Sequence, residues 1–339
     1  MIKEAIATLV AGKSLSIDEA EAAMSEIMNG EVTPAQFGAF VTALRIKGET
    51  SEEIAGMAKV MRAKAIPVHA DGPVVDTCGT GGDTASTFNI STAAAFVVAG
   101  AGLKVAKHGN RAMSSKCGSA DVLEALGVKI DLSAGQVESC LKEAGIGFMF
   151  APSFHPAMKY AGPPRREIGI RTVFNILGPL TNPAYAQAQV LGVAESSLTE
   201  KMAVVLRLLG CHHALVVHGE DGLDEITITG TTQVCELEGG QIRKYIIGPE
   251  DFGFFRASLD DVRGGTPSEN AALVRRILAG ATGPQREMVL MNAAAAIVAG
   301  GKAKTLPEGA KIAAEAIDSG RALQKLDELV KLSQSLVVS

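Results

Sequence analysis

An alternation of short apolar runs with helical patterns, beginning near residue 74, most restricts the fold of this chain. Residues 74–76, 103–106, 146–150 and 214–218 have the apolar character of buried strands, and helical patterns separate them. We also expect residues 128–130 to be extended. Strands that alternate with helices favour an α/β fold with a mostly parallel central sheet and helices on both of its faces.

Helical patterns alone fill the first 65 or so residues. Ser16, Thr33, and Thr50 or Ser51 each stand where a capping residue would begin a helix. Helical patterns return from about residue 268 onward. The sequence therefore predicts a small helical domain joined to a larger α/β domain.

Charge and composition argue against several functional classes. The formal net charge is −5, and no basic stripe is present that could neutralise the phosphates of a nucleic acid. The five cysteines are scattered, which is typical of reduced thiols in the cytoplasm. The chain opens as an amphipathic helix rather than a leader, and no apolar stretch approaches the roughly 20 residues that span a bilayer. We expect a cytoplasmic protein that binds neither nucleic acid nor membrane.

A glycine-rich loop directly follows the first expected strand. Gly79 and Gly82 stand beside Asp83, and glycines let the backbone turn its N–H groups toward a closely approaching anion. Residues 89–92 then precede an alanine-rich helix, where Ser91 and Thr92 can cap the helix and its first N–H groups can bind an anion. The sequence fits neither the dinucleotide-binding motif nor the P-loop. Taken alone, the glycines could also form a simple tight turn.

Residues 107–115 form a second donor-rich loop after the second expected strand. Lys107 and Arg111 supply cations, and Asn110 supplies an amide. Ligands of open α/β sheets bind at the carboxyl ends of the strands, where both loops are expected. Either cation alone could be solvated surface charge. Two such loops at successive strand ends favour a small phosphorylated ligand.

An ordered set of motifs resembles the anthranilate phosphoribosyltransferase family over nearly the whole chain. The resemblance implies a nucleoside-phosphorylase-type phosphoribosyltransferase fold, with a helical domain of residues 1–70 and an α/β domain of residues 71–339. Helices from about residues 165–185 would pack onto the helical domain. A homodimer formed through the helical domains is also implied, with the site between the two domains. The motifs are residues 79–83, 89–92, 107–127, 164–183 and 222–225.

The resemblance also implies a reaction of tryptophan biosynthesis. The phosphoribosyl group of phosphoribosyl diphosphate (PRPP) would pass to the amine of anthranilate, giving N-(5-phosphoribosyl)anthranilate and diphosphate with the help of two Mg²⁺ ions. Ser91, Asp224 and Glu225 would bind the metal, although local sequence alone would make the two acids a solvated pair. Anthranilate would be bound by Gly79, His108, Asn110, Arg165, Gly178 and Pro179. PRPP would be bound by Gly79, Gly82, Asp83, Thr87, Asn89, Ile90, Ser91, Thr92, Lys107, His108, Gly109, Asn110, Arg111, Ala112, Met113, Ser114, Ser115 and Ser119.

No covalent nucleophile is expected, because the substrate amine attacks directly. The cysteines have no general-base context, and no Gly-x-Ser-x-Gly motif occurs. We hypothesise that catalysis rests on positioning and charge stabilisation, without an essential protein base. His155 could line the pocket or be structural, and His212 and His213 resemble core or surface residues.

Two alternatives remain at this point. A pyrimidine nucleoside phosphorylase shares the expected fold and also handles a pentose and phosphate, but the residues around Lys107 and Arg165 resemble the transferase instead. A nucleic-acid-binding paralogue on the same scaffold should show an extended basic face and could lose Asp224 and Glu225. Phosphorolysis of a nucleoside or salt-sensitive binding to an oligonucleotide would support these alternatives.

Overall fold

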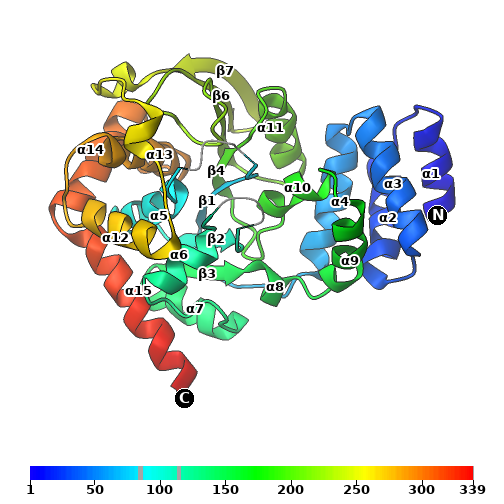
Figure 1. Cartoon of the computed structure of the whole chain (residues 1–339), viewed down its shortest axis with the longest axis horizontal. Helices are drawn as coiled ribbons and strands as arrows, with labels where there is room; N and C mark the ends of the chain where they lie inside the picture. The colour runs from blue at the N-terminus through cyan, green and yellow to red at the C-terminus, as the bar shows by residue number, and fades with distance from the viewer. Residues whose placement is uncertain (83–86, 113–115, 339) are drawn as a thin grey trace.

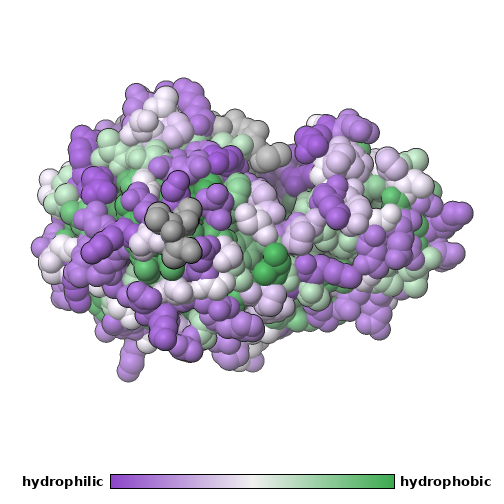
Figure 2. All heavy atoms as spheres, turned by 90° about the horizontal axis from the view of Figure 1, so that it is seen from below, coloured by the Kyte–Doolittle hydropathy of each residue, from purple (hydrophilic) through white to green (hydrophobic). Residues whose placement is uncertain are grey.

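A computed structural model of the chain describes residues 1–82, 87–112 and 116–338, with side chains described up to residue 336. A bundle of N-terminal helices forms one end of an elongated molecule, and the sheet with its helices forms the other (Figure 1). Figure 2 shows a notch between these two parts at the upper edge of that view. No helix in the described ranges is long and apolar enough to cross a membrane.

Capping residues define the helices of the N-terminal bundle. The side chains of Ser16, Thr33 and Thr50 each accept a hydrogen bond from the backbone N–H three residues later, and the residue there returns a bond to the cap. These reciprocal bonds satisfy donors that the first helical turn leaves free. All three predicted helix starts are therefore confirmed. The bundle consists of α1 (Ile2–Val10), α2 (Ile17–Asn29), α3 (Pro34–Lys47) and α4 (Ser51–Lys64).

The central sheet of the described residues has the order β3-β2-β1-β4-β5-β6-β7. The pairs from β3 through β5 are parallel, whereas β6 and β7 continue the sheet as antiparallel strands. The expected mostly parallel sheet is thus confirmed. Its strands are β1 (Val75–Gly79), β2 (Val105–Gly109), β3 (Ile146–Phe150), β4 (Ala188–Gly192), β5 (His213–Gly219), β6 (Thr232–Glu238) and β7 (Gln241–Ile247).

Helices cover the sheet on both faces. The buried helices α5 and α13 pack against each other and against the central strands, while α11 lies between the sheet and α4 of the bundle. The C-terminal helix α15 runs along α5 and past α7 (Figure 1). The α-helices that follow the bundle are α5 (Ile90–Gly100), α6 (Ser119–Ala125), α7 (Ala134–Glu143), α8 (Ala151–Phe154), α9 (Met158–Ile168), α10 (Phe174–Leu177), α11 (Leu198–Leu208), α12 (Pro267–Leu278), α13 (Pro284–Ala299), α14 (Leu306–Asp318) and α15 (Arg321–Val338). Short 3₁₀ helices are η1 (Gly178–Leu180), η2 (Pro249–Phe252) and η3 (Leu259–Val262).

Alternation along the strands divides the apolar core in two. In β5, Leu215 and Val217 join the core around α5 and α13, whereas Ala214 and Val216 join the core that includes the helical bundle and α11. Successive side chains of a strand point to opposite faces, so a fully buried strand serves both cores. Helix α9 packs against α2 and α3, and α10 packs against α4. The second core is therefore continuous from the bundle to the sheet.

Two local predictions are wrong. Residues 128–130 form no strand, although Val128 and Ile130 are buried, because the N–H of Lys129 pairs with the Ser333 hydroxyl instead of a neighbouring strand. Ser91 and Thr92 do not cap α5, since both lie inside its first turn and residue 89 is the N-cap.

Candidate functional site

The ends of β1 and β4 are shaped around the acidic residue Asp224. A Cβ atom at Gly79 would lie 2.1 Å from Asp224 Oδ2, and one at Gly192 would lie 1.6 Å from the Asp224 carbonyl oxygen. The segment after β5 therefore crosses the end of β4 and reaches β1 only because glycine stands at both strand ends. Packing thus places a carboxylate at the centre of the carboxyl edge of the sheet.

The carboxylates of Asp224 and Glu225 engage the two regions that we expected to bind anions. The Gly81 N–H donates to Asp224 Oδ2 at 2.8 Å, and the Ser91 N–H in the first turn of α5 donates to Glu225 Oε1 at 3.2 Å. Hard oxygen donors of this kind suit Mg²⁺, which commonly completes its shell with water and substrate phosphate oxygens. Among the described residues, no group of three or more His, Cys, Asp and Glu side chains could hold a metal alone. This donor set therefore fits Mg²⁺ that is shared with a phosphorylated substrate.

Lys107 places a buried ammonium group beside the same elements. Its Nζ atom donates to the Thr77 carbonyl of β1 and lies 3.4 Å from the Ser91 hydroxyl, and the residue is only 3% exposed. Thr77 in turn donates its hydroxyl to the Ser91 carbonyl at 2.9 Å. The solvated-surface interpretation of Lys107 is therefore wrong. A buried cation beside Thr77 and Ser91 makes this edge of the sheet polar within an apolar core.

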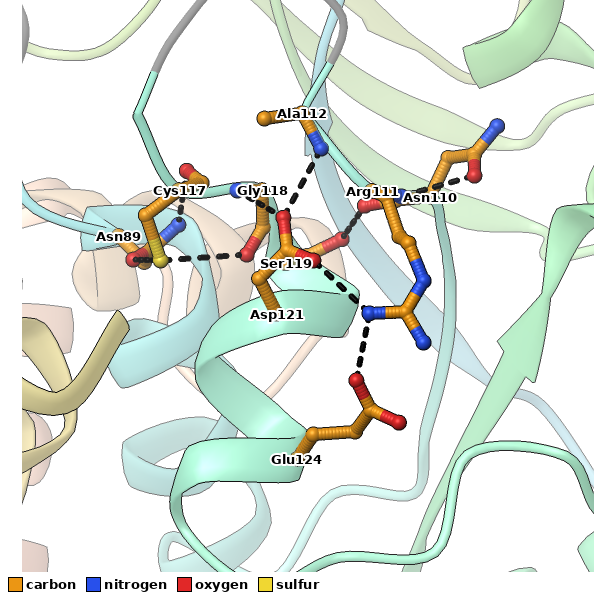
Figure 3. Close-up of polar contacts among 9 residues, drawn as sticks. All are labelled: Asn89, Asn110, Arg111, Ala112, Cys117, Gly118, Ser119, Asp121 and Glu124. Carbon is orange, nitrogen blue, oxygen red and sulfur yellow. Dashed lines mark hydrogen bonds and ion pairs between the residues drawn. The ribbon is translucent and has the colours of Figure 1, made fainter. Parts of the chain in front are cut away.

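Asn89 uses its amide to join two loops. Its Nδ2 donates to the Cys117 carbonyl at 3.1 Å, and its Oδ1 accepts from the Cys117 thiol at 3.2 Å (Figure 3). Burial raises the pKa of Cys117 to about 11, so the thiol keeps the proton that it donates. Asn270 of α12 also donates to Asn89 Oδ1, at 2.9 Å. The Asn89 side chain therefore connects residues 87–89 to the segment before α6 and to α12.

Asp121 holds both ends of the segment that precedes α6. Its Oδ2 accepts from the N–H groups of Ala112 at 3.0 Å and Gly118 at 2.8 Å, while Oδ1 pairs with Arg111 at 3.0 Å (Figure 3). Burial raises the pKa of Asp121, but these bonds and the Arg111 charge outweigh it and lower the pKa on balance. Arg111 also pairs with Glu124. Its guanidinium is thus directed toward two carboxylates of α6.

His108 and His155 form a buried pair with ring centroids 5.0 Å apart. Burial and the His155 ring lower the pKa of His108 to about 3, and burial lowers the pKa of His155 to about 4. Both rings are therefore neutral near pH 7. The Nε2 atoms of both have no hydrogen-bond partner within the part of the chain that the structure describes. This pair can offer shape and a neutral polar edge, but not a positive charge.

Comparison with known proteins agrees with this geometry. Residues 3–65 match the helical bundle domain of the glycosyl transferase family, and residues 71–323 match its a/b domain. The anthranilate phosphoribosyltransferase of Chloroflexus aggregans is 62% identical over 335 residues, which cover 98% of each chain. The chain belongs to the anthranilate phosphoribosyltransferase family.

Solved structures of this family share the whole fold. The anthranilate phosphoribosyltransferase of Thermus thermophilus aligns with a TM-score of 0.93 and 45% identity, covering 97% of this chain and 99% of that one. The Saccharomyces cerevisiae enzyme in complex with PRPP and Mg aligns with a TM-score of 0.90 and 29% identity, covering 98% of both chains. Membership of the family and its two-part fold are therefore confirmed.

The structure brings most of the site residues that the family resemblance implied to one edge of the sheet. Ser119 of α6 donates to the Asn110 carbonyl at 3.2 Å, and a Cβ atom at Gly109 would lie 2.2 Å from the Ser119 hydroxyl. Thr87 forms an isolated bridge with Arg263. Four of the predicted residues lie outside the described residues, namely Asp83, Met113, Ser114 and Ser115.

Residues near the domain junction complete the surroundings that the family resemblance implied. Arg165 lies on α9, and its pKa is lowered by burial and by the neighbouring charge of Arg171. Gly178 begins η1, and its backbone bonds to the His108 ring. Pro179 accepts a hydrogen bond from the buried Gln189 side chain at 2.7 Å.

Two neighbours of the site were missed in the sequence. Arg171 lies against Gly81 and Gly82, and Asn292 of α13 binds both the N–H and the carbonyl of Ile226 at 2.9 Å. A single asparagine in the otherwise apolar second half of α13 is a local signal, because a buried amide needs hydrogen-bond partners. Arg171 carries no comparable signal.

Proposed function

We propose that this chain catalyses the Mg²⁺-dependent transfer of the phosphoribosyl group from PRPP to the amine of anthranilate. One observation carries the proposal: the Asp224 and Glu225 carboxylates accept hydrogen bonds from the N–H groups of Gly81 and Ser91, which lie in the glycine turn and the helix start that we expect to bind phosphate. Residues expected to bind metal and residues expected to bind phosphate therefore lie next to each other, which supports the proposal. The product would be N-(5-phosphoribosyl)anthranilate, an intermediate of tryptophan biosynthesis, with diphosphate as the second product.

PRPP would lie along the carboxyl ends of β1 and β2. Backbone donors of the Gly79–Gly82 turn and of the α5 first turn would bind its phosphates, because helix N-termini and glycine turns attract anions. Ser91, Asp224 and Glu225 would hold two Mg²⁺ ions together with diphosphate oxygens. The metal supplies charge neutralisation for the leaving diphosphate. Lys107, at 3.4 Å from Ser91, adds a fixed positive charge to the same group.

Anthranilate would bind toward the helical part. Arg165 would pair with its carboxylate through the planar guanidinium fork, while Asn110 would donate to it. The neutral His108 ring, Gly178 and Pro179 would line its path. In the reaction, the amine nitrogen forms a bond to the anomeric carbon as the bond from that carbon to diphosphate breaks. The amine nitrogen then loses a proton to water, and no protein side chain needs to form a covalent bond.

The lowered pKa values of two histidines at the site support a mechanism without an essential protein base. His108 and His155 are neutral and cannot gain a proton easily, because burial lowers the pKa of both. Positioning of a weakly nucleophilic arene amine against an activated sugar therefore carries most of the catalysis.

We also propose that two domains, residues 1–70 and 71–339, enclose the site, and that the protein is a cytoplasmic homodimer.

The direct test is loss of anthranilate fluorescence after PRPP and Mg²⁺ are added. Turnover should require all three components and should stop with EDTA. Asp224→Asn and Glu225→Gln should each lose at least about 10²-fold in kcat/KM, because charge stabilisation of a leaving group is worth several kcal/mol. No turnover by folded wild-type protein would contradict the proposal.

A further inference from the structure

Arg171 reaches from the helical side of the molecule onto the glycine turn after β1. Its Nη2 donates to the Gly81 carbonyl at 3.4 Å, and a Cβ atom at Gly82 would lie 1.6 Å from Nη1. Residue 82 must therefore be glycine for the guanidinium to lie where it does. Gly81 also donates its N–H to Asp224 at 2.8 Å. One residue thus joins Arg171 to the acidic residue of the expected metal site.

The backbone of Arg171 is anchored to the bundle rather than to the sheet. It follows α9, which packs on α2 and α3, and precedes Val173 and Phe174, which are buried in the core of the helical bundle. The next residue, Thr172, is buried and donates its N–H to Asn175 at 3.0 Å. A fixed backbone with an exposed guanidinium can present that charge to a ligand without ordering the chain first.

Arg171 and Arg165 bring two positive charges together. Within the described ranges of the chain, the ion pairs include neither of these arginines. The neighbouring Arg171 charge contributes to lowering the pKa of Arg165, which shows that the two guanidinium groups repel each other. Arg171 at the edge of the glycine turn, with the Arg165 charge in its neighbourhood, forms a favourable place for a polyanion.

We propose that Arg171 binds the diphosphate group of PRPP from the helical side of the site. This inference rests on the proposed function and adds to it one more residue that binds PRPP. A planar guanidinium suits two oxygens of a phosphate group, and its contact with the turn between Gly79 and Gly82 favours diphosphate over the anthranilate carboxylate. When the carbon–oxygen bond breaks, its electron pair stays on diphosphate, and Arg171 neutralises part of that charge.

The same contact links the two parts of the molecule. Diphosphate held by both Arg171 and the glycine turn connects the helical side to the sheet, so the ligand stabilises the arrangement in which both touch it. Without diphosphate, Arg171 contacts the turn only directly, through the Gly81 carbonyl, so the ligand adds a second link. Arg171 therefore couples occupancy of the phosphate site to the junction of the two parts.

The experiment compares Arg171→Met and Arg171→Lys with Arg166→Gln, which changes an exposed arginine of α9. Steady-state kinetics would give KM for each substrate, and calorimetry would give the affinity for inorganic diphosphate with Mg²⁺. In Arg171→Met, KM for PRPP should rise about 10- to 100-fold and the diphosphate affinity should fall to a similar extent. KM for anthranilate should stay within about threefold, and Arg166→Gln should resemble wild type. Arg171→Lys keeps the charge but not the planar fork. Its KM for PRPP and its diphosphate affinity should therefore lie between those of wild type and those of Arg171→Met.

Each other outcome has a definite meaning. An unchanged diphosphate affinity in folded Arg171→Met, with only a lower melting temperature, would reduce Arg171 to a structural contact with Gly81 and overturn the inference. A selective rise in KM for anthranilate would assign Arg171 to the carboxylate and also overturn it. If Arg171→Met does not fold, the KM for PRPP and the diphosphate affinity of Arg171→Lys decide the question. If wild-type protein shows no turnover, the proposed function fails, while the diphosphate calorimetry still tests Arg171.

Discussion

Asp224 occupies the space that a side chain at Gly79 would fill, with its Oδ2 atom 2.1 Å from the site of a Cβ atom. The same oxygen accepts the Gly81 N–H at 2.8 Å. The absence of a side chain at Gly79 therefore determines where the carboxylate of Asp224, far along the chain, can lie. Close contacts of this kind make the acidic residue part of the glycine turn.

Gly79→Ala should displace the Asp224 carboxylate. A misplacement of about 1 Å at a site that depends on positioning can lower turnover about 10²-fold, and a comparable loss is expected here. Mg²⁺ titration of activity and calorimetry with Mg²⁺ and diphosphate would measure the change. Gly135→Ala is the matched control, because a Cβ atom there meets nothing within 4 Å in α7 and should stabilise the helix by about 0.5–1 kcal/mol. Unchanged Mg²⁺ dependence in Gly79→Ala would contradict the prediction.

Asn292→Leu should destabilise the protein and weaken Mg²⁺ binding. It would leave the N–H and the carbonyl of Ile226, next to Glu225, without the bonds at 2.9 Å that Asn292 provides. A buried polar group left unpaired costs about 1–3 kcal/mol of unfolding free energy. Denaturant unfolding would measure this loss, and the Mg²⁺ concentration for half-maximal activity should rise. Gln324→Leu, on the exposed face of α15, should stay within about 0.5 kcal/mol of wild type.

The buried histidine pair should make the protein less stable in acid. The unfolded chain protonates these rings below the ordinary pKa of 6.5, whereas in the folded protein the pKa of His155 is about 4 and that of His108 about 3. Their contribution is therefore complete above pH 6.5 and decreases as the pH falls toward these values. Each ring can lower the unfolding free energy by up to about 1.4 kcal/mol per pH unit.

Unfolding measured between pH 7 and pH 4.5 would test this dependence. His155→Gln should reduce the slope by up to one proton, whereas His69→Gln, which removes an exposed ring, should not. An identical slope in wild type and His155→Gln would show that the ring is not buried in its neutral form.

Substitution of Asp121 should lower the unfolding free energy more than substitution of Glu124, although both residues pair with Arg111. Asp121→Asn weakens the bonds to the N–H groups of Ala112 and Gly118, and hydrogen bonds to a charged group contribute about 1.5–3 kcal/mol. Glu124→Gln removes only a half-exposed ion pair, which is worth about 0–1 kcal/mol. Chemical denaturation of the two variants would compare them. Equal losses of unfolding free energy would mean that the pairing with Arg111, rather than the bonds to the backbone, provides the stabilisation.

Features that depend on neighbouring residues could be predicted well. Ser16, Thr33 and Thr50 cap helices as expected, because donor and acceptor are only three residues apart. The expected extended segment at residues 128–130 was wrong because its partner is Ser333, which is 204 residues away. Sequence patterns show that a residue is apolar, but they do not show which distant group its backbone meets.

By itself, the sequence determined the α/β architecture and the types of residue expected at the site: glycines near the end of β1, Lys107, and an acidic pair after β5. Lys107 was expected in the loop after a strand, whereas the structure places it inside β2, which continues to Gly109. Periodicity and local chemistry are sufficient for these features, because each depends on a few adjacent residues. Only the tertiary structure decided that the acidic segment crosses Gly192 to reach Gly79 and that Arg171 meets Gly82. Strand order and helix packing place these groups, and the contacts of Gly81 with Asp224 and with Arg171 join residues that are 143 and 90 positions apart in the chain.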